Sequence, residues 1–170
     1  MRCILIIFCF FILKSPLFAN SILLDISDST ETPEYLKAAW KEWSHYKIKL
    51  LRENKISKDS TEKYAIDKKS GQIAFITIHR RLSKKRGENF FYYFLNGKLL
   101  KILMIISDQS ALGVWKDTES GVYLFNNDSM VLKREFKIVP QDEGVLLSES
   151  GLYFTKAMQY IIADKKDSLK

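Results

Sequence analysis

Cysteine is almost absent from this chain of 170 residues. The two cysteines, Cys3 and Cys9, lie in the first ten residues, so no disulfide can form within the remainder. Small secreted animal domains usually depend on disulfides. Their absence favours a bacterial protein that is stabilised by an ordinary hydrophobic core. Bulky residues precede Cys9, whereas a lipoprotein signal has small residues there, so we do not expect this cysteine to carry a lipid.

Motifs of catalysis and metal binding are also lacking. The chain has no Gly-x-Ser-x-Gly, no His-Glu-x-x-His and no glycine-rich phosphate loop. Its two histidines, His45 and His79, do not have the spacing of metal ligands. A carboxylate pair such as Asp117 with Glu119 could serve a glycosidase, but a turn explains these residues equally well. The sequence therefore predicts no catalytic residue, no metal ligand and no cofactor, and it favours a non-enzymatic protein over a small hydrolase.

No apolar run is long enough to cross a bilayer, which takes roughly 20 residues. The longest run, Cys3–Leu13, follows Arg2 and is broken by a Lys-Ser-Pro sequence before Ala19. This order of charge, apolar run and small residue is typical of a secretory signal peptide. We expect residues 1–19 to be cleaved and the mature chain to be periplasmic or secreted. An uncleaved membrane anchor is the alternative.

The chain is basic, with a formal net charge of +7. Without Arg2 and Lys14 of the predicted signal peptide, 25 basic and 20 acidic residues leave a net charge of +5. The cations are densest in one short stretch that we expect to join two strands. This stretch is a candidate contact for an anionic lipid surface, an acidic glycan or an acidic protein, and nucleic acid is not expected as a partner. The alternative is a solvated loop. Its cations are Arg80, Arg81, Lys84, Lys85 and Arg86.

The first half of the chain predicts one helix. Residues 20–31 form a polar lead-in, and Thr32-Pro33-Glu34 is then typical of a helix start. Apolar residues at helical spacing predict a helix over residues 33–53, followed by a polar loop over residues 53–62. In an alternative reading the helix ends near His45, and the alternation of apolar residues over 46–50 marks a strand.

The second half predicts an antiparallel sheet. Apolar residues alternate with polar ones, and turn sequences interrupt them at residues 68–71, 96–97, 116–120 and 126–129. We expect six to seven strands in a meander, with the hairpin of residues 89–106 at its core and a helix packed on one face. A helical stripe predicts a second helix over residues 151–165. The fold class is therefore α+β, with one domain over residues 32–165 and a tail over 166–170.

A short sequence recurs at a spacing of thirty residues. "ESGVY" ends at Tyr123 and "ESGLY" ends at Tyr153, while Tyr93 lies thirty residues before Tyr123. The hairpins that begin at Tyr93 and Tyr123 could be a duplication, or two hairpins that obey the same turn rules. The third segment precedes a helical pattern, so the three tyrosines do not predict a solenoid.

The segment "YYFLNGKLLKI" at Tyr92–Ile102 resembles the hairpins of small exported bacterial proteins of unknown role that carry "YYF-x-NGKL". The resemblance implies a sheet between two helices and export, and it brings no catalytic residues. Ser120–Tyr123 is similar to the Ser-Gly-x-x-Tyr loop that some periplasmic lysozyme inhibitors present. It is one residue shorter, however, and neither the missing disulfide nor the positive charge fits that group.

Five aromatic residues form a second candidate site, an aromatic groove for a ligand. The alternative is that they belong to the core. Together these observations favour an exported bacterial envelope protein that acts as a binding or interaction module. An inhibitor or immunity-type protein against a toxin or a cell-wall hydrolase is the runner-up. The five aromatic residues are Trp40, Trp43, Tyr93, Trp115 and Tyr123.

Overall fold

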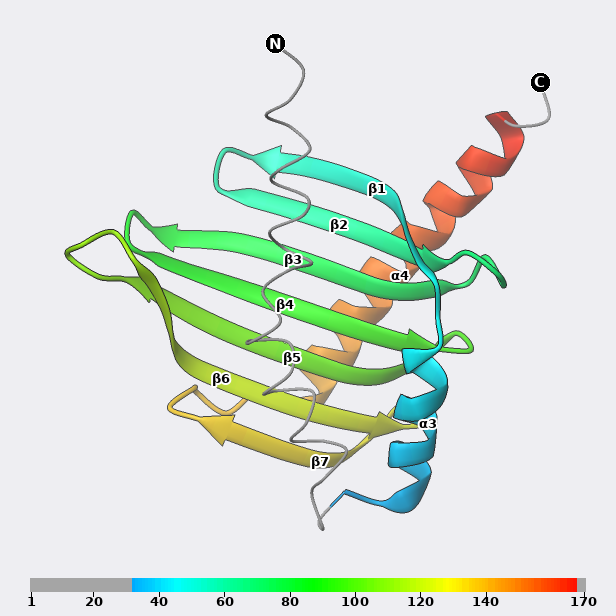
Figure 1. Ribbon diagram of the computed structural model, residues 1–170, viewed down its shortest axis with the longest axis horizontal. Helices are drawn as coiled ribbons and strands as arrows, with labels where there is room; N and C mark the ends of the chain where they lie inside the picture. The colour runs from blue at the N-terminus through cyan, green and yellow to red at the C-terminus, as the bar shows by residue number, and fades with distance from the viewer. Residues whose placement is uncertain (1–31, 168–170) are drawn as a thin grey trace.

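The fold is a single antiparallel sheet between two helices (Figure 1). The structure is a computed structural model that describes residues 32–167. The predicted signal peptide, the polar lead-in and most of the tail lie outside these residues. In chain order the elements are α3 (Glu34–Ser44), β1 (Ile48–Ser57), β2 (Ser60–Asp67), β3 (Ile73–Ser83), β4 (Arg86–Leu95), β5 (Lys98–Gln109), β6 (Trp115–Asn126), β7 (Ser129–Phe136) and α4 (Glu143–Asp167).

The seven strands follow one another across the sheet in chain order, and each pairs antiparallel with the next. The predicted α+β meander is thereby confirmed. Two of its turns need a positive φ at both central residues, as two-residue hairpin turns of this kind do. Asn96 and Gly97 have φ values of 52° and 78°, and Asn127 and Asp128 have φ values of 49° and 63°. The local turn sequences therefore fix the register of both hairpins.

The prediction of one helix over residues 33–53 is wrong beyond Ser44. The alternative, an end near His45 followed by a strand, agrees with the structure. The predicted polar loop is also wrong, because most of it belongs to β1 and its turn into β2. Asp67 holds the start of β1, since its carboxylate accepts a hydrogen bond from the Lys47 amide at 2.9 Å. As an edge strand with little buried surface, β1 can carry many charged residues. These charged residues hide the alternation of apolar and polar residues by which a strand is recognised in a sequence.

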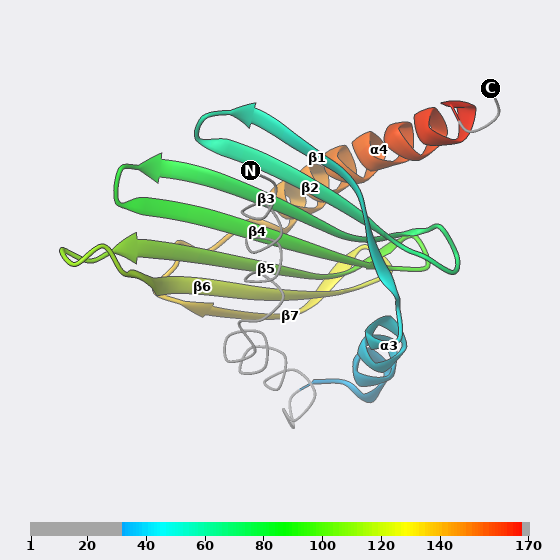
Figure 2. The same ribbon diagram turned by 45° about the horizontal axis from the view of Figure 1, so that its top comes forward.

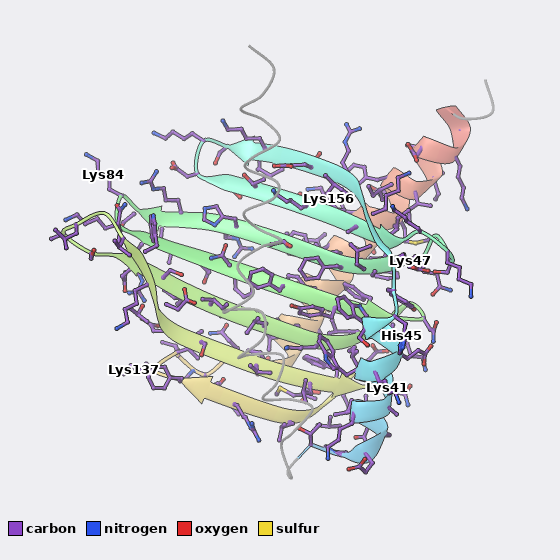
Figure 3. The ribbon with its side chains drawn as sticks, viewed as in Figure 1. Lys41, His45, Lys47, Lys84, Lys137 and Lys156 are labelled. Atoms are coloured by element: carbon purple, nitrogen blue, oxygen red, sulfur yellow. The ribbon has the colours of Figure 1, made fainter. Side chains whose placement is uncertain are left out.

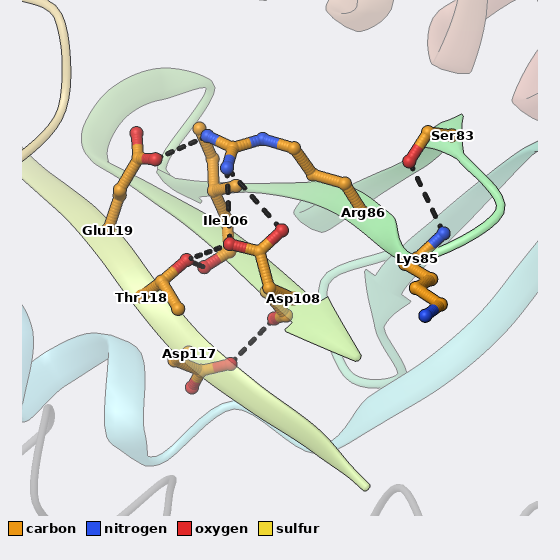
Figure 4. A network of polar contacts seen from close by, with 9 residues as sticks. Ser83, Lys85, Arg86, Ile106, Asp108, Asp117, Thr118 and Glu119 are labelled. Carbon is orange, nitrogen blue, oxygen red and sulfur yellow. Dashed lines mark hydrogen bonds and ion pairs between the residues drawn. The ribbon is translucent and has the colours of Figure 1, made fainter. Parts of the chain in front are cut away.

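The turn predicted at residues 116–120 is wrong too, because this polar stretch lies inside β6. Its side chains bond to polar side chains of β5: Asp117 accepts from Ser107 at 2.6 Å, and Thr118 donates to Asp108 at 2.8 Å (Figure 4). A bulge in the β5–β6 pairing accommodates the extra residue at Thr118. Polar side chains that pair across strands allow a strand without apolar alternation.

Helix α4 begins at Glu143, eight residues before the predicted start, and continues beyond the predicted end at residue 165. Asp142 explains the early start. Its side chain accepts a hydrogen bond from the Val145 amide at 3.1 Å, as an N-cap residue does. Gly151, which we expected as the first residue of this helix, therefore lies in its interior.

Helices lie on both faces of the sheet, not on one as predicted (Figures 1 and 2). The long helix α4 crosses one face obliquely, here called the α4 face. The short helix α3 packs on the other face, the α3 face, near the Asn96-Gly97 turn. Two cores result, one for each helix. The α4 face buries Tyr64, Ile76, Tyr92, Ile102, Tyr123, Phe125, Leu146 and others, and the α3 face buries Leu36, Trp40, Tyr93, Leu100, Leu103 and Leu124.

The three tyrosines spaced by thirty residues have different positions. Tyr93 belongs to the core of the α3 face, whereas Tyr123 belongs to the core of the α4 face. Tyr93 lies three residues before Asn96, the first residue of its turn, and Tyr123 lies four residues before Asn127, the first residue of its turn. Successive side chains of a strand point to opposite faces, so this difference of one residue places the two tyrosines on opposite faces. Tyr153 is buried in helix α4. The tyrosines are therefore not structurally equivalent, despite their spacing.

Candidate functional site

The candidate site lies on the α3 face, at the end of the sheet that is remote from α3. Among the described elements, only α3 packs on this face, and it contacts β4 and β5 near their other end. Strand pairing aligns one residue from each of four strands into a row across the remote end. From β3 to β6, the row is Arg81, Gly87, Ser107 and Asp117.

A pocket of about 420 Å³ lies over this row. Its volume is within the range of 300–1,000 Å³ that is usual for small-molecule sites. Its lining combines one aromatic ring with several polar side chains. The lining residues are His79, Arg81, Gly87, Asn89, Ser107 and Trp115.

Gly87 lies under the pocket and creates space for it. The residue is buried in β4, a central strand, where glycine is unfavourable compared with a residue that has a side chain. Its φ does not lie in the left-handed region, so the backbone does not require glycine. A Cβ at this position would stand 3.6 Å from Cε1 of His79 and 3.7 Å from Cζ3 of Trp115. The His79 and Trp115 rings therefore flank an empty space about the size of a methyl group.

Hydrogen bonds hold the polar walls of the pocket. His79 Nδ1 lies 2.9 Å from Oδ1 of Asn89. With the amide oxygen as acceptor, Nδ1 is the donor of this hydrogen bond, and Nε2 is left to face other groups. On the opposite side, the Ser107 hydroxyl donates to the Asp117 carboxylate at 2.6 Å. The site thus presents both donors and acceptors in fixed positions.

Trp115 lies at the start of β6, where the pairing with Gln109 places it on the same face as the row. The side chain is 44% exposed although it contacts the pocket. Tryptophan has a large apolar ring and one N–H donor, and it is often found where a protein binds a ligand or partner. Half-buried beside polar groups, Trp115 is a suitable surface for stacking.

The predicted basic stretch is the β3–β4 hairpin, and the sheet divides its cations between the two faces. Arg86 forms ion pairs with Asp108 at 3.1 Å and with Glu119 (Figure 4). The hydrogen bond to Glu119 raises the pKa of the Arg86 guanidinium. Arg80 lies 3.7 Å from Glu88 and 3.9 Å from Glu149. These two cations therefore stabilise the α4 face and are committed to contacts within the protein.

The other three cations, Arg81, Lys84 and Lys85, are exposed. Lys84 is at the tip of the hairpin, far from α3 (Figure 3). Within residues 32–167 no ion pair involves any of the three. Arg81 also lines the pocket, so the remaining positive charge of the hairpin lies beside it.

The five predicted groove residues do not come together. Trp40, Trp43 and Tyr93 pack as one cluster under α3, with ring centroids 5.0–5.3 Å apart. Trp43 also donates its indole N–H to the Ala74 carbonyl at 3.0 Å. Trp115 is at the far end of this face, in the pocket. Tyr123 is on the α4 face, where its hydroxyl donates to Glu135 at 3.0 Å.

Four residues of the pocket were not among the predicted site residues: Gly87, Asn89, His79 and Ser107. They come from three strands, and only the register brings them together. One local signal pointed to them, namely a glycine three residues before the aromatic run of a central strand.

Within the described part of the chain, no three side chains are grouped as metal ligands. None of the helices in that part is both long enough and apolar enough to cross a membrane. Comparison with known protein families, curated proteins and solved structures finds no match for this chain.

Proposed function

We propose that this protein is a non-enzymatic binding module of the bacterial envelope, and that it binds its ligand in the pocket over Gly87. The predicted signal peptide supports the location. The pocket supports the binding role, since it combines a stacking surface at Trp115 with fixed hydrogen-bonding groups.

The empty space over Gly87 is the observation that carries the proposal. A glycine in a central strand destabilises a sheet by about 0.5–1 kcal/mol compared with alanine. Here the backbone conformation does not need it, and no neighbouring side chain fills the space. A strand glycine often marks close approach of a ligand or another backbone. Ligand binding accounts for a residue that fold stability does not favour.

The inhibitor alternative receives no support from the position of Ser120–Tyr123. This segment is not a loop, because it lies within β6 and pairs with β5 on one side and β7 on the other. The ring of Tyr123 folds over Gly121, with its hydroxyl 2.6 Å from where a Cβ would stand. These residues are therefore occupied in the sheet and its core.

The test is a binding experiment on the mature chain, residues 20–170, labelled with ¹⁵N. Envelope extract is separated into protein, glycan and lipid fractions, and each fraction is titrated into the protein. We expect one fraction to shift the Trp115 indole signal and the Gly87 amide signal. The Gly87→Val variant, whose side chain occupies the space between His79 and Trp115, should lose the Trp115 shift.

Lys69→Ser is the matched control, because it changes an exposed residue in a turn at the other end of the sheet. It should bind as the unchanged protein does. If no fraction shifts Trp115 and Gly87, or if Gly87→Val binds normally while folded, the proposal is wrong.

A further inference from the structure

We infer that the ligand of this pocket is an acidic oligosaccharide, a sugar chain that carries a carboxylate or a phosphate. The inference rests on the proposed function, since it names the chemical class for the same site. It depends on what the two walls of the pocket can bind.

The wall formed by β3 suits an anion. The Arg81 guanidinium donates to the carbonyl oxygens of Ser83 at 3.2 Å and of Lys84 at 2.8 Å. These bonds hold the group in place and use two of its five N–H donors. The remaining donors can bind a carboxylate or phosphate, and Lys84 and Lys85 add positive potential nearby.

The side of the pocket towards β6 suits hydroxyl groups. Asp117 lies next to the pocket lining: it is exposed, and its carboxylate accepts a hydrogen bond from Ser107, which lines the pocket. An ionised carboxylate only accepts, and it has about four lone-pair positions. Sugar hydroxyls can donate to those that remain. An inorganic anion or an acid without hydroxyls would instead meet the like charge of Asp117, so the pocket favours a ligand with an anionic group and separate donors.

Between the two walls the pocket suits a ring. Trp115 offers an apolar surface to the C–H face of a sugar, while the His79–Asn89 pair supplies hydrogen-bonding groups beside it. Gly87 leaves the floor between these groups without a side chain.

The length of the row suits more than one ring. Arg81 and Asp117 are three strands apart, and strands in a sheet are about 4.8 Å apart, so their Cα atoms are separated by about 14 Å. A ligand of two or three sugar rings is long enough to follow the row from one end to the other.

The experiment titrates purified probes into the same labelled protein at constant ionic strength. Trigalacturonic acid is the carboxylate probe, a phosphorylated maltotriose is the phosphate probe, and galactotriose and maltotriose are their neutral counterparts. Inorganic phosphate and vesicles of phosphatidylglycerol test whether negative charge alone is sufficient. The readout is the Trp115 indole signal together with the Gly87 amide.

We expect at least one acidic trisaccharide to bind about tenfold or more tightly than its neutral counterpart, as charge-assisted hydrogen bonds to a guanidinium imply. Arg81→Ser should remove this difference and leave the neutral probe unaffected. Lys69→Ser, which removes the same charge elsewhere, should have no effect. Circular dichroism of each variant verifies that it is folded.

The inference is wrong if acidic and neutral trisaccharides bind equally, if neither binds, or if Arg81→Ser retains the preference for the acidic probe. It is also wrong if inorganic phosphate or the vesicles shift Trp115 and Gly87 as strongly as the trisaccharides do. The proposed function survives these outcomes when an envelope fraction still binds in a way that Gly87→Val abolishes. If neither fraction nor probe affects the pocket, both proposals fail.

Discussion

Substitution by alanine should change the free energy of unfolding in opposite directions at two glycines of the sheet, Gly87 in β4 and Gly121 in β6. At Gly87, the nearest atoms to an added Cβ are 3.6–3.9 Å away, which is ordinary van der Waals contact. Alanine therefore fits without displacement. It also reduces the backbone entropy that is lost on folding, so Gly87→Ala should raise the free energy of unfolding by about 0.5–1 kcal/mol.

At Gly121, an added Cβ would stand 2.6 Å from the Tyr123 hydroxyl oxygen and 2.8–2.9 Å from two of its ring carbons. The ring has no room to move, because Tyr123 is fully buried and its hydroxyl is bonded to Glu135. Overpacking of this kind usually costs about 1–3 kcal/mol. Gly121→Ala should therefore lower the free energy of unfolding by that amount.

Urea unfolding followed by circular dichroism measures both effects. A double-mutant cycle tests the assigned cause: in a Tyr123→Ala background, Gly121→Ala should lose most of its cost, because the clashing ring is gone. The reasoning is refuted if Gly87→Ala destabilises the protein, or if the cost of Gly121→Ala is the same in both backgrounds.

Three further predictions concern pH and packing. Burial is the main cause that raises the pKa of four tyrosines, and for Tyr93 it is the sole cause. Unfolded tyrosines ionise above pH 10, whereas these four stay protonated in the folded state, so the free energy of unfolding should fall by about 1.4 kcal/mol per tyrosine at pH 11. Urea titrations of Tyr93→Phe should show a fall that is smaller by the contribution of one tyrosine. The Ser70 amide, which donates to Asp67, lowers the pKa of that carboxyl, so the stability it provides is present above about pH 4 and is lost as the pH falls further. In Asp67→Asn the free energy of unfolding should fall less between pH 4 and pH 2 than in the unchanged protein. An equal fall in both proteins would contradict the assignment. Trp40→Ala should cost about 3–5 kcal/mol in urea unfolding because the ring is buried between α3 and the sheet, and a cost below 1 kcal/mol would show that α3 contributes little. The four tyrosines are Tyr64, Tyr92, Tyr93 and Tyr123.

The strands that were predicted correctly are those whose local sequence is consistent with burial. In the β4–β5 hairpin, the Asn-Gly turn fixes the register, and the apolar residues on both faces match two cores. The edge strand β1 was predicted only in the alternative reading, and the first half of β6 was missed, for the opposite reason. Their residues are polar because they face solvent or pair with other polar side chains, and an apolar pattern cannot reveal such pairing.

The candidate site could be predicted only in part. Arg81 and Trp115 were both named from the sequence, but in two separate hypotheses, since thirty-four residues separate them. What joins them is the register of β3 through β6 together with the bulge near Thr118. Similarly, the sequence groups Arg80 with Arg81, whereas alternation along β3 sends them to opposite faces.

The course of α4 has a consequence for folding. Every strand pairs only with its neighbours in the chain, so the hairpins can form through contacts that are close in sequence, and such contacts form fast. Helix α4, by contrast, returns from β7 across the sheet to β1, where Tyr160 accepts a hydrogen bond from Asn54, 106 residues away. The meander can therefore assemble strand by strand during synthesis on the ribosome. Its α4 face, however, is covered only after the residues of α4 have been synthesised.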